Sequence, residues 1–103
     1  LTLLEGSIYR FDTSSSTTAT HPFRLSTTSD GTHGGGSIYT DGVTIVGTQG
    51  QSGSYLQITV ASGAPTLHYF CTAHSGMGNQ ININALFTEI TPSQTPDWQD
   101  IAA

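Results

Sequence analysis

Turn-forming residues divide this chain into short segments, and this feature restricts its fold more than any other. Clusters of Gly, Pro, Ser and Asn recur roughly every 8 to 12 residues, a spacing typical of all-β sandwiches and barrels. Between the clusters, apolar residues alternate with polar ones instead of recurring at the period of a helix. The sequence therefore predicts about six or seven short strands, in an antiparallel sandwich or barrel, and almost no helix.

The clearest strand covers residues 55–60, where Leu56, Ile58 and Val60 share one face. In residues 66–71 both faces are apolar or aromatic, which favours a central strand. Further strand-like segments are residues 1–4, 7–12, 21–28 and 81–90, while residues 12–20 and 29–37 are expected to be loops and residues 38–54 a short strand or a helical turn.

The length of the chain, 103 residues, is enough for one domain with a single core. We expect residues 1–90 to form this domain as a β-sandwich. Residues 91–103 contain two prolines and no strand period, so they are expected to be a linker or a docking tail. Trp98 in this tail is a candidate anchor for a neighbouring chain, since an exposed Trp is costly to leave in water.

The charge of the chain excludes two classes of partner. The formal net charge is −5, and only two residues are Lys or Arg. So few cations cannot neutralise a run of phosphates, which excludes nucleic acid, and they give no attraction to an anionic membrane. No apolar run approaches the roughly 18 residues of a membrane-spanning helix. The abundance of Ser, Thr and Gly is typical of extracellular or virion-surface β proteins.

The residues with metal-binding side chains gather in one short stretch. The only Cys and the only Met of the chain are Cys71 and Met77, and His74 lies between them. This spacing places them at the end of the strand 66–71 and on the turn that follows. His21 begins another strand and is the best candidate for a second imidazole. A thiolate, two imidazoles and a weakly bound thioether form the ligand set of a blue-copper electron-transfer site.

Other interpretations of these side chains stay open at this point. Cys71 is either a metal ligand, a buried apolar residue, which is the usual role of a free Cys, or a nucleophile paired with His74. The nucleophile is disfavoured because a base three residues away in a tight turn has poor geometry, and no oxyanion donors are evident. Met77 is nearly as well explained by packing as by ligation. No catalytic residue is assigned, and the protein is not expected to be an enzyme.

Two further histidines are expected to lie outside the site. His33 belongs to a glycine-rich stretch and is expected in a solvent-exposed loop, although it is the substitute ligand if His21 is elsewhere. His68 alternates away from Cys71 along its strand, so it is expected to be a packed or surface histidine and not a ligand. The glycine-rich stretch itself lacks the Lys and the strand–loop–helix context of a phosphate-binding loop.

Five stretches of the sequence carry a family resemblance: YRFD, HPFRLSTTSDGTHGGG, YTDGVT, ITVASGAPTLHYFC and HSGMG, which together span roughly residues 5–80. They resemble the cupredoxins, and more closely a cupredoxin-like module found in structural proteins of marine bacteriophages, especially cyanophages. The resemblance implies an antiparallel Greek-key β-sandwich with copper as its cofactor. The residues that it puts at the copper-ligand positions are His21, Cys71, His74 and Met77.

The resemblance leads to two functional hypotheses. In the first, the domain is a non-enzymatic structural module of a phage particle, such as a decoration, tail or fibre domain, and is located in the virion. Its partners are then other virion proteins or copies of itself, reached through residues 91–103, which resemble spacers between domains. In the second, the chain is a soluble blue-copper electron-transfer protein of the periplasm or the extracellular space.

Overall fold

The structure of the protein, a computed structural model, describes residues 1–85. Its strands are β1 (Thr2–Leu4), β2 (Ile8–Asp12), β3 (Phe23–Ser26), β4 (Val43–Val46), β5 (Tyr55–Thr59), β6 (Leu67–Cys71) and β7 (Gly78–Asn84), and its helical segments are α1 (Thr17–Thr20) and the 3-10 turn η1 (Gly31–Gly34). The prediction of a mostly β chain is confirmed for these residues. The expected domain end at residue 90, and the tail at 91–103 with Trp98, lie outside the described residues.

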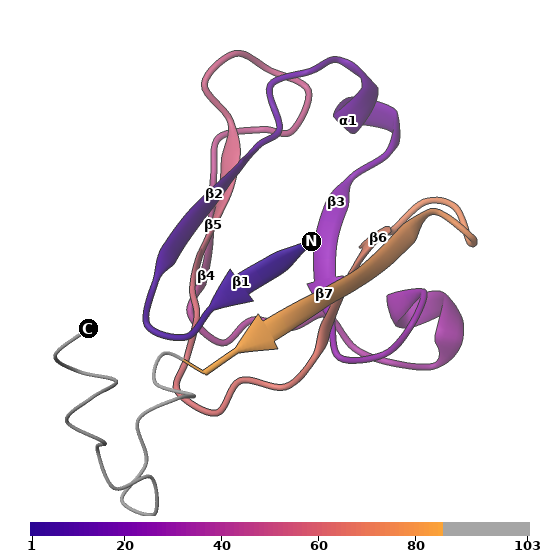
Figure 1. The fold of residues 1–103 in the computed structure, drawn as a ribbon. Helices are drawn as coiled ribbons and strands as arrows, with labels where there is room; N and C mark the ends of the chain where they lie inside the picture. The colour runs from indigo at the N-terminus through magenta and orange to yellow at the C-terminus, as the bar shows by residue number, and fades with distance from the viewer. Residues whose placement is uncertain (86–103) are drawn as a thin grey trace, which may run out of the picture.

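The strands form two sheets, with the orders β1–β7–β6–β3 and β2–β5–β4 (Figure 1). Four strand pairs are antiparallel, as predicted. Strand β1, however, lies parallel to β7. The prediction of a wholly antiparallel sandwich is therefore wrong at this pair. The physical reason for the parallel direction is the long connection between these strands. β1 and β7 stand at opposite ends of the described chain, and no tight turn fixes their relative direction.

The two sheets share one apolar core. Leu56 and Ile58 of β5 are fully buried on one side, and Leu25 of β3 and Leu67 of β6 are fully buried on the other. The alternation predicted for residues 55–60 is confirmed, because the odd-numbered residues of this segment are more exposed than the even-numbered ones. Two sheets that bury their facing sides against each other are compatible with an all-β sandwich.

Strand β6 is buried on both faces. Leu67 packs in the core between the sheets, whereas Phe70 belongs to the opposite face and is still only 1% exposed. The turn η1 covers this ring, and a Cβ added to Gly31 would collide with it. Gly31 also has a φ of 52°, a left-handed conformation that glycine adopts without steric cost. The glycine-rich loop therefore closes over the outer side of β6.

The helical turn α1 lies within residues 12–20, which the sequence predicts as a loop without regular structure. The Thr18 hydroxyl lies 2.7 Å from the Thr13 carbonyl and 2.8 Å from the Ser15 carbonyl, and this side-chain bonding compacts the segment. At the end of α1 the His21 N–H donates to the carbonyl of residue 17 at 3.0 Å. The turn therefore leads directly into His21 and strand β3.

The structure shows where strands lie in two other segments. Residues 38–54 contain strand β4, so the strand alternative is correct for this stretch. Strand β7 begins at Gly78, before the start that the pattern from residue 81 predicts, because it pairs with β6 up to the turn that joins them. None of the helical segments within residues 1–85 has the length and the apolar character needed to span a membrane.

Ile58 and Ile8 form a matched pair for testing the core. Both lie in the sheet β2–β5–β4, but Ile58 is fully buried and Ile8 is 62% exposed. We expect Ile58→Ala to lower the free energy of unfolding by about 2–5 kcal/mol, because it leaves a cavity. The control Ile8→Ala should change this free energy by less than about 0.5 kcal/mol. Urea unfolding measures both, and equal losses would contradict the assignment of Ile58 to the core.

Candidate metal centre

His21 reaches the centre because strands β3 and β6 pair in one register. Phe23 lies opposite Cys71 in this antiparallel pair. Just beyond it, the Thr72 N–H donates to the Pro22 carbonyl at 3.1 Å, which continues the pairing past the end of β6. The same end of the sheet therefore carries Cys71 on one strand and His21 on the neighbouring segment, although they are distant in sequence.

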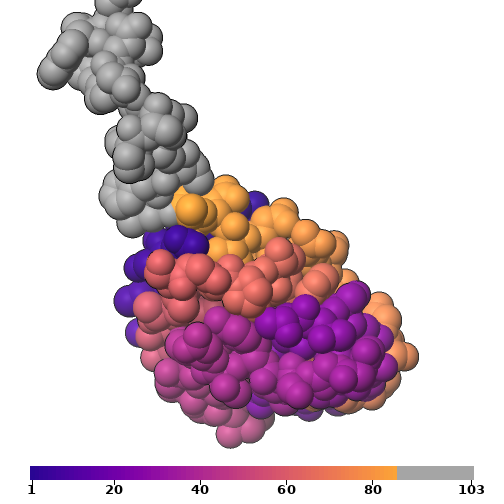
Figure 2. Space-filling view, turned by 90° about the horizontal axis from the view of Figure 1, so that it is seen from below, coloured from indigo at the N-terminus to yellow at the C-terminus, as the bar shows by residue number. Residues whose placement is uncertain are grey.

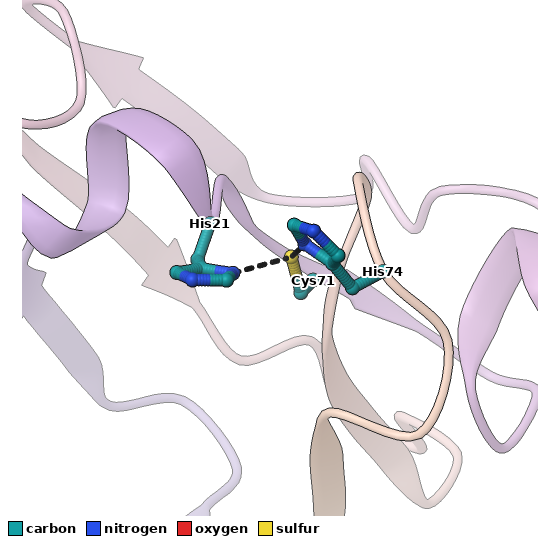
Figure 3. A group of neighbouring side chains, drawn as sticks. All are labelled: His21, Cys71 and His74. Carbon is teal, nitrogen blue, oxygen red and sulfur yellow. Dashed lines mark hydrogen bonds between the residues drawn. The ribbon is translucent and has the colours of Figure 1, made fainter.

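His74 is carried by the turn of residues 72–77 between β6 and β7. The Cys71 N–H donates to the Met77 carbonyl at 3.0 Å and closes this turn at its base. Gly76 has a φ of 77°, so the turn passes through a conformation that a residue with a Cβ rarely adopts. The closed turn folds the His74 ring back toward Cys71 (Figure 3).

The side chains of His21, Cys71 and His74 converge on one point (Figure 3). The Cys71 Sγ lies 3.6 Å from His21 Nδ1 and 3.7 Å from His74 Nδ1. The two ring centroids are 4.7 Å apart, and the rings are tilted by 47°. One ligand atom from each side chain lies within 4.8 Å of the others, so this group could hold a metal ion. The structure thus brings together three of the four predicted ligands.

The two sulfur–nitrogen distances of this group fit a shared ion. In zinc sites sulfur and nitrogen lie at about 2.3 Å and 2.0–2.1 Å from the metal, so donors at tetrahedral to trigonal angles are about 3.5–3.8 Å apart. Both sulfur–nitrogen distances, 3.6 and 3.7 Å, fall in that interval. A thiol can also donate to one imidazole and accept from the other, so the same distances suit two hydrogen bonds. The spacing is therefore compatible with a shared ion, and a metal titration distinguishes the two arrangements.

The centre combines a buried sulfur with an exposed imidazole. Cys71 is 5% exposed, whereas His21 is half-buried and His74 is exposed. Met77, the fourth predicted ligand, is 41% exposed and borders the same small cavity as Cys71 and His21. This cavity has a volume of about 160 Å³ and is lined by His21, Phe23, Tyr69, Phe70, Cys71, Met77 and Gly78. The aromatic residues in this lining limit the access of water to the sulfur.

His33 supports the centre without belonging to the donor group. It is exposed, as predicted for the glycine-rich loop, but its Nε2 lies 2.9 Å from the Cys71 carbonyl oxygen. A carbonyl only accepts, so the Nε2–H of His33 is the donor. Its ring also meets the Phe70 ring edge-on, with centroids 6.2 Å apart. His33 therefore does not replace His21 as a ligand, and its contact with the main chain of Cys71 has no signal in the sequence.

His68 lies outside the three-donor group, in line with its alternation away from Cys71 along β6. It is half-buried and borders a polar cavity on another side of the turn 72–77. This cavity has a volume of about 300 Å³ and is lined by Ser29, Asp30, His68, Gly76, Gly78, Asn79 and Gln80.

The geometry also bears on the nucleophile interpretation of Cys71. Poor geometry was expected for a base three residues away in a tight turn, and His74 Nδ1 lies 3.7 Å from the sulfur. The turn closes at its base, and this closure brings the imidazole back toward the strand. A Cys–His nucleophile, however, needs one imidazole as base. Here His21 and His74 share the sulfur, and a metal centre accounts for both of them.

Comparisons of the chain with protein-family models, with curated proteins and with solved structures found no match. The resemblance to cupredoxins and to their phage-borne relatives therefore stays a prediction from the sequence motifs. The arguments for a metal centre rest instead on the positions of His21, Cys71 and His74 in the structure.

The thiol of Cys71 gives a direct test of metal binding by this centre. We expect the full chain to bind one Co(II) with an intense near-ultraviolet thiolate-to-metal band, and Cys71→Ser to lose that band because the sulfur donor is gone. The stability of the metal-free protein should change little, since the thiol lies at the end of β6. Absorption titration and urea unfolding measure the two effects. A loss of several kcal/mol in the metal-free variant would instead favour a packing role for the thiol.

Proposed function

We propose that this protein is a cupredoxin-like Greek-key β-sandwich that binds one copper ion and serves, without enzymatic activity, as a structural module of a virus particle. One observation carries the copper assignment: the sulfur of Cys71 lies within 3.7 Å of an imidazole nitrogen from His21 and of one from His74. A thiolate with two imidazoles in a trigonal arrangement is the donor set of blue-copper sites.

Copper suits these donors better than the harder divalent ions. Thiolate and imidazole are soft to borderline ligands, whereas magnesium, calcium and manganese favour carboxylate, carbonyl and water oxygens. The three-donor group contains no carboxylate. A thiolate and two imidazoles can also hold both Cu(I) and Cu(II). The shielded position of Cys71 protects the sulfur from solvent, which affects the reduction potential of such a site.

In this proposal Met77 is the weak axial ligand. Its main chain is tied to Cys71 by the hydrogen bond that closes the turn, and its side chain borders the cavity beside the sulfur. A thioether at a long distance contributes little to affinity but adjusts the reduction potential of the copper.

The role in a virion rests on the sequence resemblance and on composition. Only 9% of the residues are charged, and Ser, Thr and Gly are abundant. A copper ion that binds only the folded domain would add to its durability, by about 2.7 kcal/mol at a free copper concentration one hundred times the dissociation constant. The partners would be other virion proteins or copies of the same chain, through residues 91–103.

A soluble blue-copper electron carrier is the second candidate function. The exposure of His74 beside the buried Cys71 favours it, since an imidazole at the surface shortens the distance from the centre to a redox partner. The location would then be the periplasm or the extracellular space. Both candidates use the same ligands and the same scaffold.

Copper titration tests the proposed centre. We expect reduced, folded protein to bind one Cu(II) with an intense visible thiolate-to-copper band, and His21→Ala to weaken both binding and band because one imidazole donor is lost. His68→Ala is the control, because this histidine lies outside the donor group. Absorption and electron paramagnetic resonance spectra measure the outcome. Folded protein that gives no band would refute the copper proposal.

The axial role of Met77 has its own test. We expect Met77→Leu to keep one bound copper and to raise the reduction potential, because the lost thioether donor stabilises Cu(II) more than Cu(I). Voltammetry of both proteins measures the difference. An unchanged potential would mean that Met77 packs beside the centre without binding the ion.

Particle composition separates the two functions. If the chain co-purifies with virus particles in many copies, the carrier hypothesis fails. If it is absent from particles and the purified copper protein exchanges one electron reversibly at a physiological potential, the virion proposal fails.

A further inference from the structure

The turn that carries His74 is held from outside by the loop of residues 27–36. Asp30 Oδ1 accepts a hydrogen bond from the Gly76 N–H at 3.0 Å, and His33 Nε2 donates to the Cys71 carbonyl at 2.9 Å. We propose that Asp30 and His33 are positioning residues of the metal centre, which hold the turn so that His74 faces Cys71. This inference rests on the proposed function, because it names residues that the same site depends on.

The two hydrogen bonds fall on either side of His74. One reaches Cys71, just before the turn, and the other reaches Gly76, near its end. His74 itself is exposed, so burial in the core does not hold its side chain in place. The bond between Cys71 N–H and the Met77 carbonyl closes only the base of the turn. The contact from Asp30 therefore adds a fixed point on the far side of His74.

The loop is firm enough to act as a support. The Ser26 hydroxyl donates to the Ser37 carbonyl at 2.7 Å and accepts from the Thr28 N–H at 3.1 Å, which ties both ends of the loop to strand β3. Within the loop, the Gly36 N–H donates to the Gly31 carbonyl at 3.0 Å. A support anchored to the sheet can transmit the rigidity of the core to an exposed turn.

Packing and backbone conformation fix the loop in addition. Gly31 lies directly against the buried Phe70 ring, where a Cβ would not fit. Asp30 has a φ of 61°, a left-handed conformation that is uncommon for a residue with a side chain. Conformations of this kind persist where the surroundings hold them, and they concentrate at functional sites. In Figure 2 the purple of the residues near 30 borders the orange of the residues near 80.

Asp30 acts by accepting a hydrogen bond and also carries a negative charge, and two substitutions separate these effects. Asp30→Asn keeps an oxygen that can accept from Gly76 but removes the charge, whereas Asp30→Ala removes both. Glu5 supplies a matched control, because its carboxylate accepts from the Gly63 N–H at 2.9 Å in a turn that carries none of the proposed ligands.

The experiment measures Co(II) affinity and the thiolate-to-metal spectrum of the full 103-residue chain and its variants. We expect Asp30→Ala to weaken Co(II) binding about 10–100-fold, the range typical when an outer partner of a metal ligand is lost, and to alter the band. Asp30→Asn should stay close to the unmodified protein, and Glu5→Ala should match it. If Asp30→Asn loses as much Co(II) affinity as Asp30→Ala, the charge of Asp30 and not its positioning of the turn is responsible, and the inference is overturned.

His33 is tested in the same way. His33→Ala removes the donor to the Cys71 carbonyl, while His33→Gln offers an amide N–H in its place and should restore much of the affinity. Because both residues hold one turn, the double variant Asp30→Ala with His33→Ala should lose a different amount than the sum of the single losses. Strict additivity would contradict a shared role.

Amide hydrogen exchange of the metal-free protein keeps this inference separate from the copper proposal. We expect Asp30→Ala to speed exchange at Gly76 and in the rest of residues 72–77, and Glu5→Ala to leave that segment unchanged. If the unmodified chain binds no metal, the proposed function fails, and faster exchange in Asp30→Ala still supports the positioning role. If Asp30→Ala matches the unmodified chain in affinity, spectrum and exchange, the inference fails while the copper proposal stands.

Discussion

The pairing of strand β3 with β6 is the constraint on which the candidate centre depends. Cys71 and His74 are close in the chain, but His21 is separated from Cys71 by 50 positions. Only the register that sets Phe23 opposite Cys71 brings the imidazole of His21 to the sulfur. A slip of one residue would turn the side chains of one strand to the other face of the sheet. The burial of Leu25 in the core opposes such a slip, so the hydrophobic packing of the domain indirectly sets the geometry of the centre.

Contacts on the outer side of β6 also fix the position of this strand. The core holds one face of this strand, and the loop around η1 holds the other through Gly31 and Phe70. The same loop contacts the main chain of Cys71 and of Gly76. Close packing against an aromatic ring and left-handed turns therefore account for glycines in this loop.

The sequence predicted those features that follow from side-chain pattern, and it missed those that depend on long-range pairing or on main-chain contacts. The face formed by Leu56 and Ile58 could be foreseen because period-two alternation follows from the geometry of one strand. The parallel direction of β1 could not, since it depends on pairing with β7 at the other end of the described chain. The short helix α1 was missed because its local hydrogen bonds from Thr18 to the carbonyls of Thr13 and Ser15 leave no hydrophobic period in the sequence. The cluster of Cys71 with His74 was visible as spacing, whereas the proximity of His21 required the correct strand register.

Asp30 and His33 were out of reach of the sequence analysis for a different reason. Each reaches the turn through a backbone atom of its partner, the Gly76 N–H or the Cys71 carbonyl. Every residue carries a backbone carbonyl, and every residue other than proline carries an N–H. The residue type of the partner therefore gives no sign of the contact. A motif search finds ligands by residue type, but it does not find the groups that hold those ligands in place.

The arrangement separates the stability of the domain from the assembly of its centre. The apolar core cluster lies between the two sheets, whereas the donor group lies at one end of β6, with one imidazole on an exposed turn. Side chains at a strand end contribute less to the core than Leu25 or Leu67 do. We therefore expect the sheets to fold without a metal, and the affinity for the ion then to depend on how narrowly the turn restricts His74 before the ion arrives. A turn held at both sides loses less conformational entropy on binding than a free one, so its supports affect affinity as directly as the ligands do.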